Sequence, residues 1–338
     1  MANDGHEKSP LSDSLAANES GLGIENLNDR LLRYAGGKNR ALDMAKYITD
    51  YHTGKGKVGG NPLLYRANKR LAGNLRACAS YLVFKNYYNV NQVRLYAFTA
   101  CRKHLLCPFC AMRRGAKYLQ AYYERLQVIL AEQPSERPLK AYMVTLTVKD
   151  GANLWERYSA LRNALKRYQE KRRNALKGQG MVEYAKATGG VMSSEVKRGK
   201  GSGLWHPHVH MVWLCEQKPD ARQLSKEWLE VTGDSYIVDV RELYGDSVID
   251  GFLEVFKYAL KFSDMELSDN WHAYETLQGK RMVESFGLFR GVEVPDNLTD
   301  DELADEPYLL MLYRFVKNAG YSFVGQGDEQ SIVDLLND

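Results

Sequence analysis

The stretch HPHVHMVW, residues 206–213, is the most informative part of this sequence. Alternate residues of a β-strand point to the same face, so His208 and His210 can face one metal ion while Val209 points to the core. Imidazole is the commonest metal-binding side chain in proteins. Three of the chain's 7 histidines lie in this stretch, which favours a metal site over ordinary surface histidines. His206 has the same parity and could be a ligand or a group behind the ligands.

A glycine-rich segment, residues 199–203, precedes this strand and predicts a β-hairpin with residues 190–196. With the turn centred in that segment, Glu195 lies opposite His208. Two imidazoles and one carboxylate on one sheet face could hold a divalent ion and leave positions open for water or a phosphate oxygen. Glu195 is therefore the third candidate ligand.

Residues 250–262 (DGFLEVFKYALKF) have the spacing of an amphipathic helix. Glu254, Tyr258 and Lys261 fall on the side opposite the apolar residues, which weakens simple packing in the core as the explanation for this tyrosine. A phenol with a pKa of about 10 is a weak nucleophile at neutral pH. Lys257 and Lys261 could stabilise the phenolate, and Glu254 could act as a base for water. This interpretation requires the helix to pack beside the histidine strand.

The remaining patterns alternate between helix and strand, without a glycine-rich phosphate loop. We expect helices at residues 27–51, 63–81, 111–130, 154–177, 221–231 and 248–262, and strands at residues 91–99, 141–148, 190–196, 208–214 and 236–240. Residues 309–316 also have helical spacing. This order indicates an α+β protein with a largely antiparallel sheet.

The domain organisation follows from changes in composition. Residues 1–25 are polar and are expected to be a disordered tail. Prolines near residue 138 separate an N-terminal, mainly helical region (26–138) from a catalytic domain (139–290), and an acidic extension (291–338) follows. The first 21 residues lack the apolar run of a signal peptide, and no apolar run is long enough to span a membrane, so we expect a cytosolic protein.

The net charge of +4 hides an uneven distribution. Residues 291–338 carry 11 acidic and 2 basic side chains, which leaves 44 basic and 31 acidic residues in the rest of the chain. A cationic body suits a polyanionic partner such as nucleic acid. The residues expected to contact DNA are Arg102, Lys103, Arg113, Arg114, Lys117, Lys166, Arg172, Arg173 and Lys257.

A cysteine cluster precedes the proposed catalytic domain. Cys101, Cys107 and Cys110, with His104 between them, offer up to four metal ligands within ten residues, and Cys78 could replace His104 as the fourth. Cys-Pro-Phe-Cys has the tight-turn form of a zinc knuckle. The odd total of 5 cysteines argues against a disulfide framework. We expect structural Zn²⁺ that fixes a basic loop and carries no chemistry.

Three segments, TLTVKD (145–150), HPHVHMVW (206–213) and LEVFKYALKF (253–262), resemble in order and spacing the three motifs of the HUH endonucleases. The greatest similarity is to rolling-circle plasmid replication proteins of the Rep_1 family, and it covers roughly residues 95–290. This resemblance implies a ferredoxin-like antiparallel sheet flanked by helices and a catalytic Mg²⁺ or Mn²⁺ ion. It also implies Tyr258 as the nucleophile, His208 and His210 as metal ligands, and Glu254 as the group that activates water for the terminating cleavage.

The resemblance implies a reaction and its partners as well. The tyrosine would nick one strand of a plasmid origin exposed as single-stranded DNA in a hairpin, leaving a 5′-phosphotyrosine and a free 3′-OH primer. A host helicase and replication machinery would then be recruited; the oligomeric state stays open, with a dimer as one option. Two-tyrosine relatives carry a second tyrosine one turn away, where this chain has Glu254 and Phe262, which favours an initiator over a single-strand transposase or relaxase. A non-catalytic, zinc-dependent DNA-binding repressor is the rival from another class.

Overall fold

The computed structural model describes residues 26–54, 61–133, 136, 138–245, 247–304 and 306–337 of the 338-residue chain. For residues 258–260 and 263 it describes the backbone but not the side chains. The expected disordered tail, residues 1–25, lies outside the described part. Within that part, no helix has the length and apolar character needed to cross a membrane.

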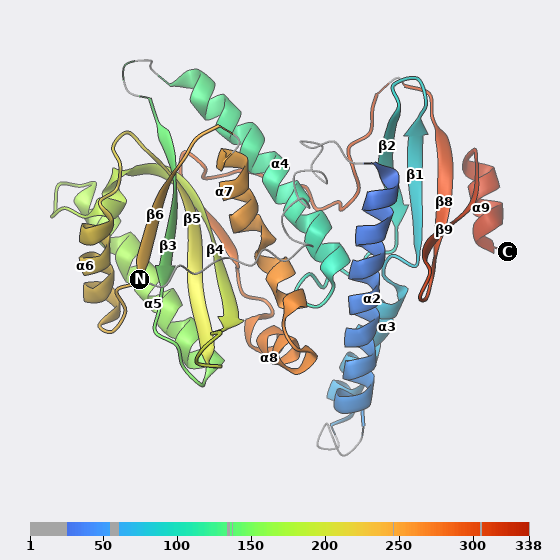
Figure 1. Ribbon diagram of the computed structural model, residues 1–338, viewed down its shortest axis with the longest axis horizontal. Helices are drawn as coiled ribbons and strands as arrows, with labels where there is room; N and C mark the ends of the chain where they lie inside the picture. Colours follow the sequence, from blue (N-terminus) through green and yellow to red (C-terminus); the bar gives the residue numbers. More distant parts are fainter. Residues whose placement is uncertain are drawn as a thin grey trace. The chain divides into compact units, whose positions relative to one another are not determined.

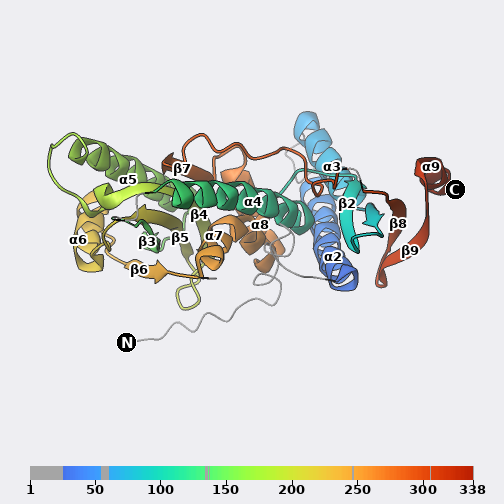
Figure 2. The same ribbon diagram turned by 90° about the horizontal axis from the view of Figure 1, so that it is seen from above.

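The chain divides into two compact units. The first comprises Met1–Lys117 and Pro295–Asp338, and the second comprises Tyr118–Val294. The acidic C-terminal residues thus belong to the same unit as the N-terminal region. Helix α4 (Pro108–Glu132) contributes residues to both units. Figures 1 and 2 show the elements of each unit in two views.

The second unit is built on a five-stranded antiparallel sheet with the order β6-β3-β5-β4-β7. Its strands are β3 (Lys140–Thr147), β4 (Ala187–Arg198), β5 (Trp205–Cys215), β6 (Val238–Leu243) and β7 (Val283–Gly287). Its helices are α5 (Leu154–Ala175), η1 (Glu183–Lys186), α6 (Ala221–Thr232), α7 (Ser247–Phe256), η2 (Lys257–Asp264) and α8 (Leu267–Leu277). The prediction of an α+β fold with antiparallel sheets is confirmed.

The two faces of this sheet are covered differently. Val209, Met211 and Trp213 point to the face where α5 and α6 complete the hydrophobic core. Because side chains alternate along a strand, His208 and His210 point to the opposite face, against which α7 packs. The sequence pattern of β5 therefore separates a core face from a face that carries polar side chains.

The first unit contains a four-stranded antiparallel sheet with the order β2-β1-β8-β9. Its strands are β1 (Tyr81–Tyr87), β2 (Gln92–Phe98), β8 (Leu309–Val316) and β9 (Gly320–Gly327), and its helices are α2 (Leu27–His52), α3 (Pro62–Ala77), α9 (Glu329–Asn337) and the first part of α4. A small core of Val83, Leu310, Leu312 and Ile332 joins α9 to the sheet.

Two predictions of secondary structure were wrong. Residues 309–316 form strand β8 instead of a helix, because they pair with β1 and β9, and a short apolar run fits either periodicity. The helix predicted for residues 248–262 is α-helical only to Phe256 and continues as the 3₁₀ helix η2. Strands β1, β7 and β9 were not predicted.

Candidate active site

The histidine strand and its hairpin partner bring three polar side chains together. Glu195 of β4 pairs directly with His208 of β5, which is the register predicted from the position of the turn. Glu195, His208 and His210 are buried, with side-chain exposures of 2%, 5% and 9%. Buried polar groups require partners, so this cluster is not an ordinary part of a hydrophobic sheet face.

The spacing of the three side chains fits a metal ion. Glu195 Oε2 lies 3.3 Å from His208 Nε2 and 3.6 Å from His210 Nε2, and the two Nε2 atoms lie 3.1 Å apart. Neighbouring ligands about 2.1 Å from an octahedral ion lie about 3 Å apart. The donors could thus occupy one face of an ion and leave the opposite face open. The other oxygen of the same carboxylate, Glu195 Oε1, is buried without a hydrogen-bond partner in the described part of the chain, so the surrounding side chains do not fully satisfy this group.

Neighbouring groups orient both imidazoles. The Oγ1 of Thr145, on the adjacent strand β3, lies 3.0 Å from His210 Nδ1. The Nδ1 of His208 lies 3.4 Å from the backbone carbonyl oxygen of His206, to which it can donate. Because each Nδ1 has a partner of its own, each Nε2 is turned towards Glu195. Groups of this kind fix the tautomer and the orientation of metal-binding histidines.

The protonation states at neutral pH also suit a cation. Burial alone would raise the pKa of Glu195, but His210, His208 and Lys261 more than offset it and hold the pKa well below its ordinary value. Burial lowers the pKa of His210 to about 4, against the attraction of Glu195. At pH 7 the carboxyl group is therefore ionised and the imidazole of His210 is neutral, which are the states that bind metals.

His206 lies behind the ligands. Its Nδ1 is 2.5 Å from Asp150 Oδ1, and Asp150 Oδ2 accepts a hydrogen bond of 2.7 Å from the hydroxyl of Ser202. Its side chain does not belong to the group that Glu195 and the other two histidines form. The sequence leaves open whether His206 is a metal ligand or a group behind the ligands, and the geometry favours the second role.

Helix α7 brings a second carboxylate to the cluster. Glu254 Oε1 lies 3.7 Å from His210 Nε2, and Lys257 and Lys261 both pair with Glu254, the latter at 3.5 Å. Burial and Glu195 raise the pKa of Glu254, but the lowering effect of Lys261, His210 and Lys257 is larger. The pKa of Glu254 is therefore below its ordinary value. The contact between this helix and the histidine strand, on which the tyrosine interpretation depends, is present. The backbone of Tyr258 lies in η2, directly after Lys257; its side chain lies outside the described part.

Four cysteines of the first unit form a second cluster. Cys78, Cys101, Cys107 and Cys110 have Sγ atoms within 4.8 Å of one another. Three of the separations are 3.5, 3.6 and 3.7 Å, too long for disulfide bonds. Sulfurs about 2.3 Å from the centre of a tetrahedron lie about 3.8 Å apart, which fits zinc.

Cys78 completes this group in place of His104, which was the first choice from the sequence. His104 lies within the loop between Cys101 and Cys107 but is not a member of the group. Cys78 is the residue that ends helix α3, so the folded chain brings it to the other three cysteines from 23 residues away. Spacing along the sequence favoured His104 only because His104 is closer than Cys78 to the other three cysteines in the chain.

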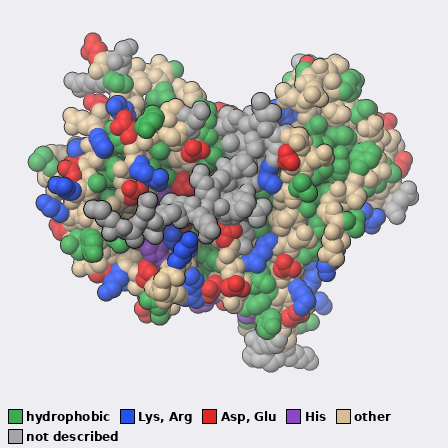
Figure 3. Space-filling view, viewed as in Figure 1, with side chains coloured by type: hydrophobic (Ala, Val, Ile, Leu, Met, Phe, Trp, Pro, Cys, Tyr) green, Lys and Arg blue, Asp and Glu red, His purple; other side chains and the backbone are tan. Residues whose placement is uncertain are grey.

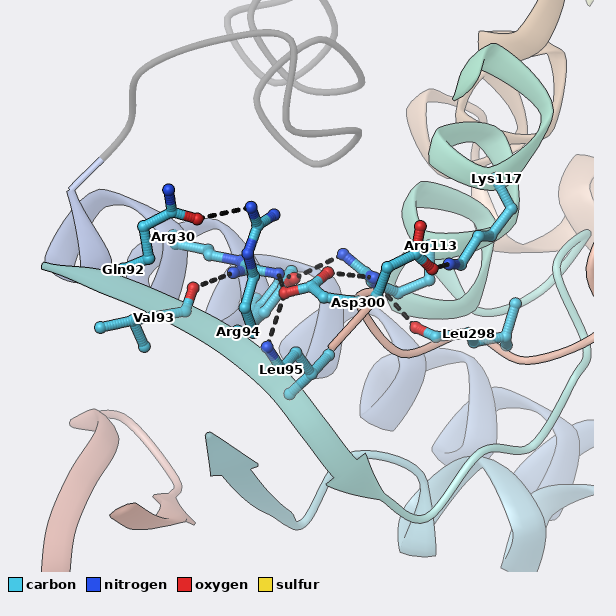
Figure 4. A network of polar contacts seen from close by, with 11 residues as sticks. Arg30, Gln92, Val93, Arg94, Leu95, Arg113, Lys117, Leu298 and Asp300 are labelled. Atoms are coloured by element: carbon cyan, nitrogen blue, oxygen red, sulfur yellow. Dashed lines mark hydrogen bonds and ion pairs between the residues drawn. The ribbon is translucent and has the colours of Figure 1, made fainter. Parts of the chain in front are cut away.

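The basic residues expected at DNA have different environments. Arg113 and Lys117 are buried and pair with Asp300 and Asp301, so in this arrangement they are held inside the unit (Figure 4). Arg114 donates to the backbone oxygen of Pro295.

Arg172 is half-buried and donates to the backbone oxygen of Ala187, and Lys257 forms an ion pair with Glu254. Arg102, Lys166 and Arg173 are exposed, and Lys103 is half-buried. On the face shown in Figure 3, Lys and Arg side chains are interspersed with Asp and Glu side chains.

Two residues of the site were not identified from the sequence. Thr145 and Asp150 both belong to the TLTVKD segment, whose importance was recognised only as a motif. Thr145 could have been found from its position along the strand, because it faces the same side of the sheet as the histidines. Using this position requires knowing that the two strands are neighbours in the sheet. The order of strands is a long-range property that the sequence alone did not provide.

Comparison with known proteins gives two matches. A family model described as a replication protein, Rep_1, matches residues 92–310. A protein named "Protein rep" from Streptococcus pneumoniae serotype 2 (strain D39 / NCTC 7466) is 27% identical over 234 residues, covering 64% of this chain and 69% of the relative. No solved structure shows a significant match. The family match includes both the histidine hairpin and helix α7.

Proposed function

Since this chain belongs to the Rep_1 family of replication proteins, we propose that it initiates rolling-circle replication of a plasmid by nicking one strand of the origin. The observation that carries the proposal is the convergence of Glu195, His208 and His210 with Glu254 of α7, four residues before Tyr258. A metal-binding cluster beside a tyrosine helix is the arrangement that this chemistry requires.

The proposed reaction is a transesterification. The Tyr258 hydroxyl gives up its proton and its oxygen forms a bond to the phosphorus of the nick site. The bond from phosphorus to the 3′ oxygen breaks, and the 3′ oxygen takes up one proton to become the primer hydroxyl, so no proton is gained or lost overall. A Mg²⁺ or Mn²⁺ ion held by Glu195, His208 and His210 would polarise the phosphate. Lys261 carries positive charge within reach of this cluster: burial lowers its pKa, but Glu195 and Glu254 raise it overall.

Glu254 acts as the general base in the terminating cleavage. When the strand has been copied, a water molecule gives a proton to this carboxylate and its oxygen bonds to the phosphorus of the regenerated nick site. The bond from phosphorus to the 3′ oxygen breaks and that oxygen takes up a proton; no new phosphotyrosine forms, so the enzyme does not begin another round. The low pKa of Glu254 keeps it ionised and able to accept the proton at neutral pH. Rejoining of the displaced strand reverses the first transesterification.

The DNA must be single-stranded at the nick site, because Glu195, His208 and His210 are buried and a duplex would hold its backbone away from them. We propose an origin exposed in a hairpin loop, with a host helicase and replication machinery as later partners. We also propose that the four cysteines hold a structural Zn²⁺ ion. It would have no open position and would take no part in the reaction.

The test uses single-stranded oligonucleotides that tile the DNA flanking the gene, incubated with the purified full chain and Mn²⁺. A covalent protein–DNA product on a denaturing gel, with the DNA mapped to Tyr258 by mass spectrometry, is expected. Tyr258→Phe should abolish it. A zinc-dependent repressor would bind the same DNA without forming such a product with any metal, which would overturn the proposal.

A further inference from the structure

Helix α3 of the first unit has one buried side and one side that faces solvent. Asn68, Leu71, Ala72 and Leu75 are its buried residues, and α3 packs on α2. The opposite side is exposed and carries Arg66, Ala67, Lys69, Arg70, Gly73, Asn74 and Ala77 over about three turns, after the exposed Pro62 and Leu63 of the first turn. In Figure 2, α3 projects beside α2 within its unit. The proposed nicking reaction makes no use of this surface.

The charge of the exposed side is of one sign. The sequence of α3 contains no acidic residue. Arg66, Lys69 and Arg70 form no ion pair with any carboxylate in the described part of the chain, and Lys69 lies only near the ring of Tyr65, at 6.0 Å. The long basic helix α5 differs, because its Arg162 and Lys171 pair with acidic partners. Unpaired cations on a regular helix favour a polyanionic partner.

The shape of this side suits the major groove of duplex DNA. The groove is about 12 Å wide and admits an α-helix, and α3 is about 24 Å long at 1.5 Å per residue. Ala67, Gly73 and Ala77 are small and lie between the polar residues, and a Cβ atom on Gly73 would meet nothing within 4 Å. Small residues let the helix backbone approach closely, so that the longer Arg66 and Arg70 side chains can reach base edges.

Both ends of α3 are fixed, as a helix that reads a sequence requires. The side chain of Asn61 accepts hydrogen bonds from the backbone nitrogens of Leu63 and Leu64 at the start of the helix. At the other end, the buried Lys38 of α2 donates to the backbone oxygens of Arg76 and Cys78 at 2.5 and 2.6 Å. Cys78, which ends the helix, belongs to the cysteine cluster, so a bound metal ion would anchor that end as well.

We propose that α3 is the element that recognises the double-stranded origin, by lying in the major groove. Arg66 and Arg70, one turn apart, can each donate two hydrogen bonds to a guanine, and Asn74 can pair with an adenine. Lys69 contacts phosphate. The inference rests on the proposed function, because it assigns recognition of duplex DNA to the first unit and leaves strand cleavage to the second.

The test is selection of binding sites from a pool of random duplexes of about 20 base pairs, with the full chain and with two variants. The wild type is expected to select a consensus sequence. Arg66→Ala with Arg70→Ala should bind the selected duplex about ten-fold or more weakly and lose the preference at the bases it read. Arg66→Lys keeps the charge but not the bidentate geometry, so it should keep non-specific affinity and lose discrimination.

Lys46→Ala with Lys317→Ala is the matched control, since it removes two exposed charges from the same unit and should select the wild-type consensus. The proposal is overturned if the α3 variants select the wild-type consensus with unchanged affinity, or if the wild type selects none. Each variant is also assayed for the covalent product on single-stranded DNA. The α3 variants should form it normally, whereas its absence from the wild type would count against the nicking function instead.

Discussion

Glu254 Oε1 of helix α7 lies 3.7 Å from His210 Nε2 of strand β5. This short distance joins two sequence segments that are 44 residues apart and that carry separate parts of the proposed chemistry. It also places the carboxylate between the candidate metal ligands and the two lysines, Lys257 and Lys261. In the proposed reaction, Glu254 would accept a proton at the phosphate that the cluster would hold.

Replacing Glu254 by Gln should separate the two halves of the reaction. The amide keeps the size of the side chain but cannot accept the proton of water, so hydrolysis should fall by about 10²- to 10⁴-fold while attack by Tyr258 continues. A time course on a denaturing gel should show the covalent product accumulating. The control is Glu230→Gln, which removes an exposed carboxylate paired with Lys171. If Glu254→Gln forms no covalent product, the carboxylate is needed for the first step and its proposed role is wrong.

Thr145 offers a way to perturb the metal site without removing a ligand. Its hydroxyl lies 3.0 Å from His210 Nδ1, and Thr145→Val preserves the shape but removes that contact. Loss of a group that orients a metal-binding histidine weakens metal affinity by about 10- to 100-fold. Titration with Mn²⁺, followed by electron paramagnetic resonance, measures this directly. Thr188→Val also removes a hydroxyl hydrogen bond from β4, to the backbone oxygen of Leu214, and should leave Mn²⁺ affinity unchanged.

The β4–β5 hairpin is the part of the candidate site that could be predicted from the sequence. The turn residues and the period of two along each strand predicted that Glu195 faces His208, and the structure has that pair. Both signals are local, since they depend on a few residues of a continuous segment. The contact of Glu254 with His210 could not be predicted in this way, because no local pattern shows which helix covers which sheet face. It was only a condition that the interpretation of Tyr258 as a nucleophile had to meet.

The first unit shows where local patterns fail. Residues 309–316 were predicted as a helix, yet they form β8 beside β1, more than 200 residues earlier in the chain. Pairing with distant strands decides the conformation of such a short apolar segment, and its own periodicity does not. The choice of the fourth ligand in the cysteine cluster, His104 or Cys78, stayed open for the same reason, because the fold brings Cys78 to the other three cysteines across a helix end and a β-hairpin.

The cysteine cluster leads to a prediction about zinc. Cys78→Ser should lose bound zinc and unfold at a lower temperature, since binding of a structural metal contributes directly to folding. His104→Gln should keep it, because the four sulfurs already complete a tetrahedral set. Zinc content is measured by mass spectrometry of the purified protein. Cys215→Ser, in the other unit, is the control for loss of a buried thiol. Zinc loss in His104→Gln with retention in Cys78→Ser would contradict this assignment.

Asp300 leads to a prediction about stability and pH. It accepts hydrogen bonds from Arg113 and Arg30 at 2.6 and 2.7 Å and from the backbone nitrogen of Leu95 (Figure 4). Burial would raise its pKa, but the two arginines and that backbone group lower it to about 2. The ordinary value for Asp is about 3.9, so the shift corresponds to about 2 to 3 kcal/mol of stability at neutral pH.

Because the pKa of Asp300 is lower in the folded state, this stabilisation is complete above about pH 5 and is lost as the pH falls towards 2. Asp300→Asn should therefore lower the free energy of unfolding most at pH 7, and the difference from the wild type should shrink on acidification. Urea denaturation at a series of pH values measures it. Asp296→Asn removes a carboxylate of the same segment that is 91% exposed and should change little at any pH. A deficit in Asp300→Asn that stays constant down to pH 3 would show that its ionisation does not stabilise the fold.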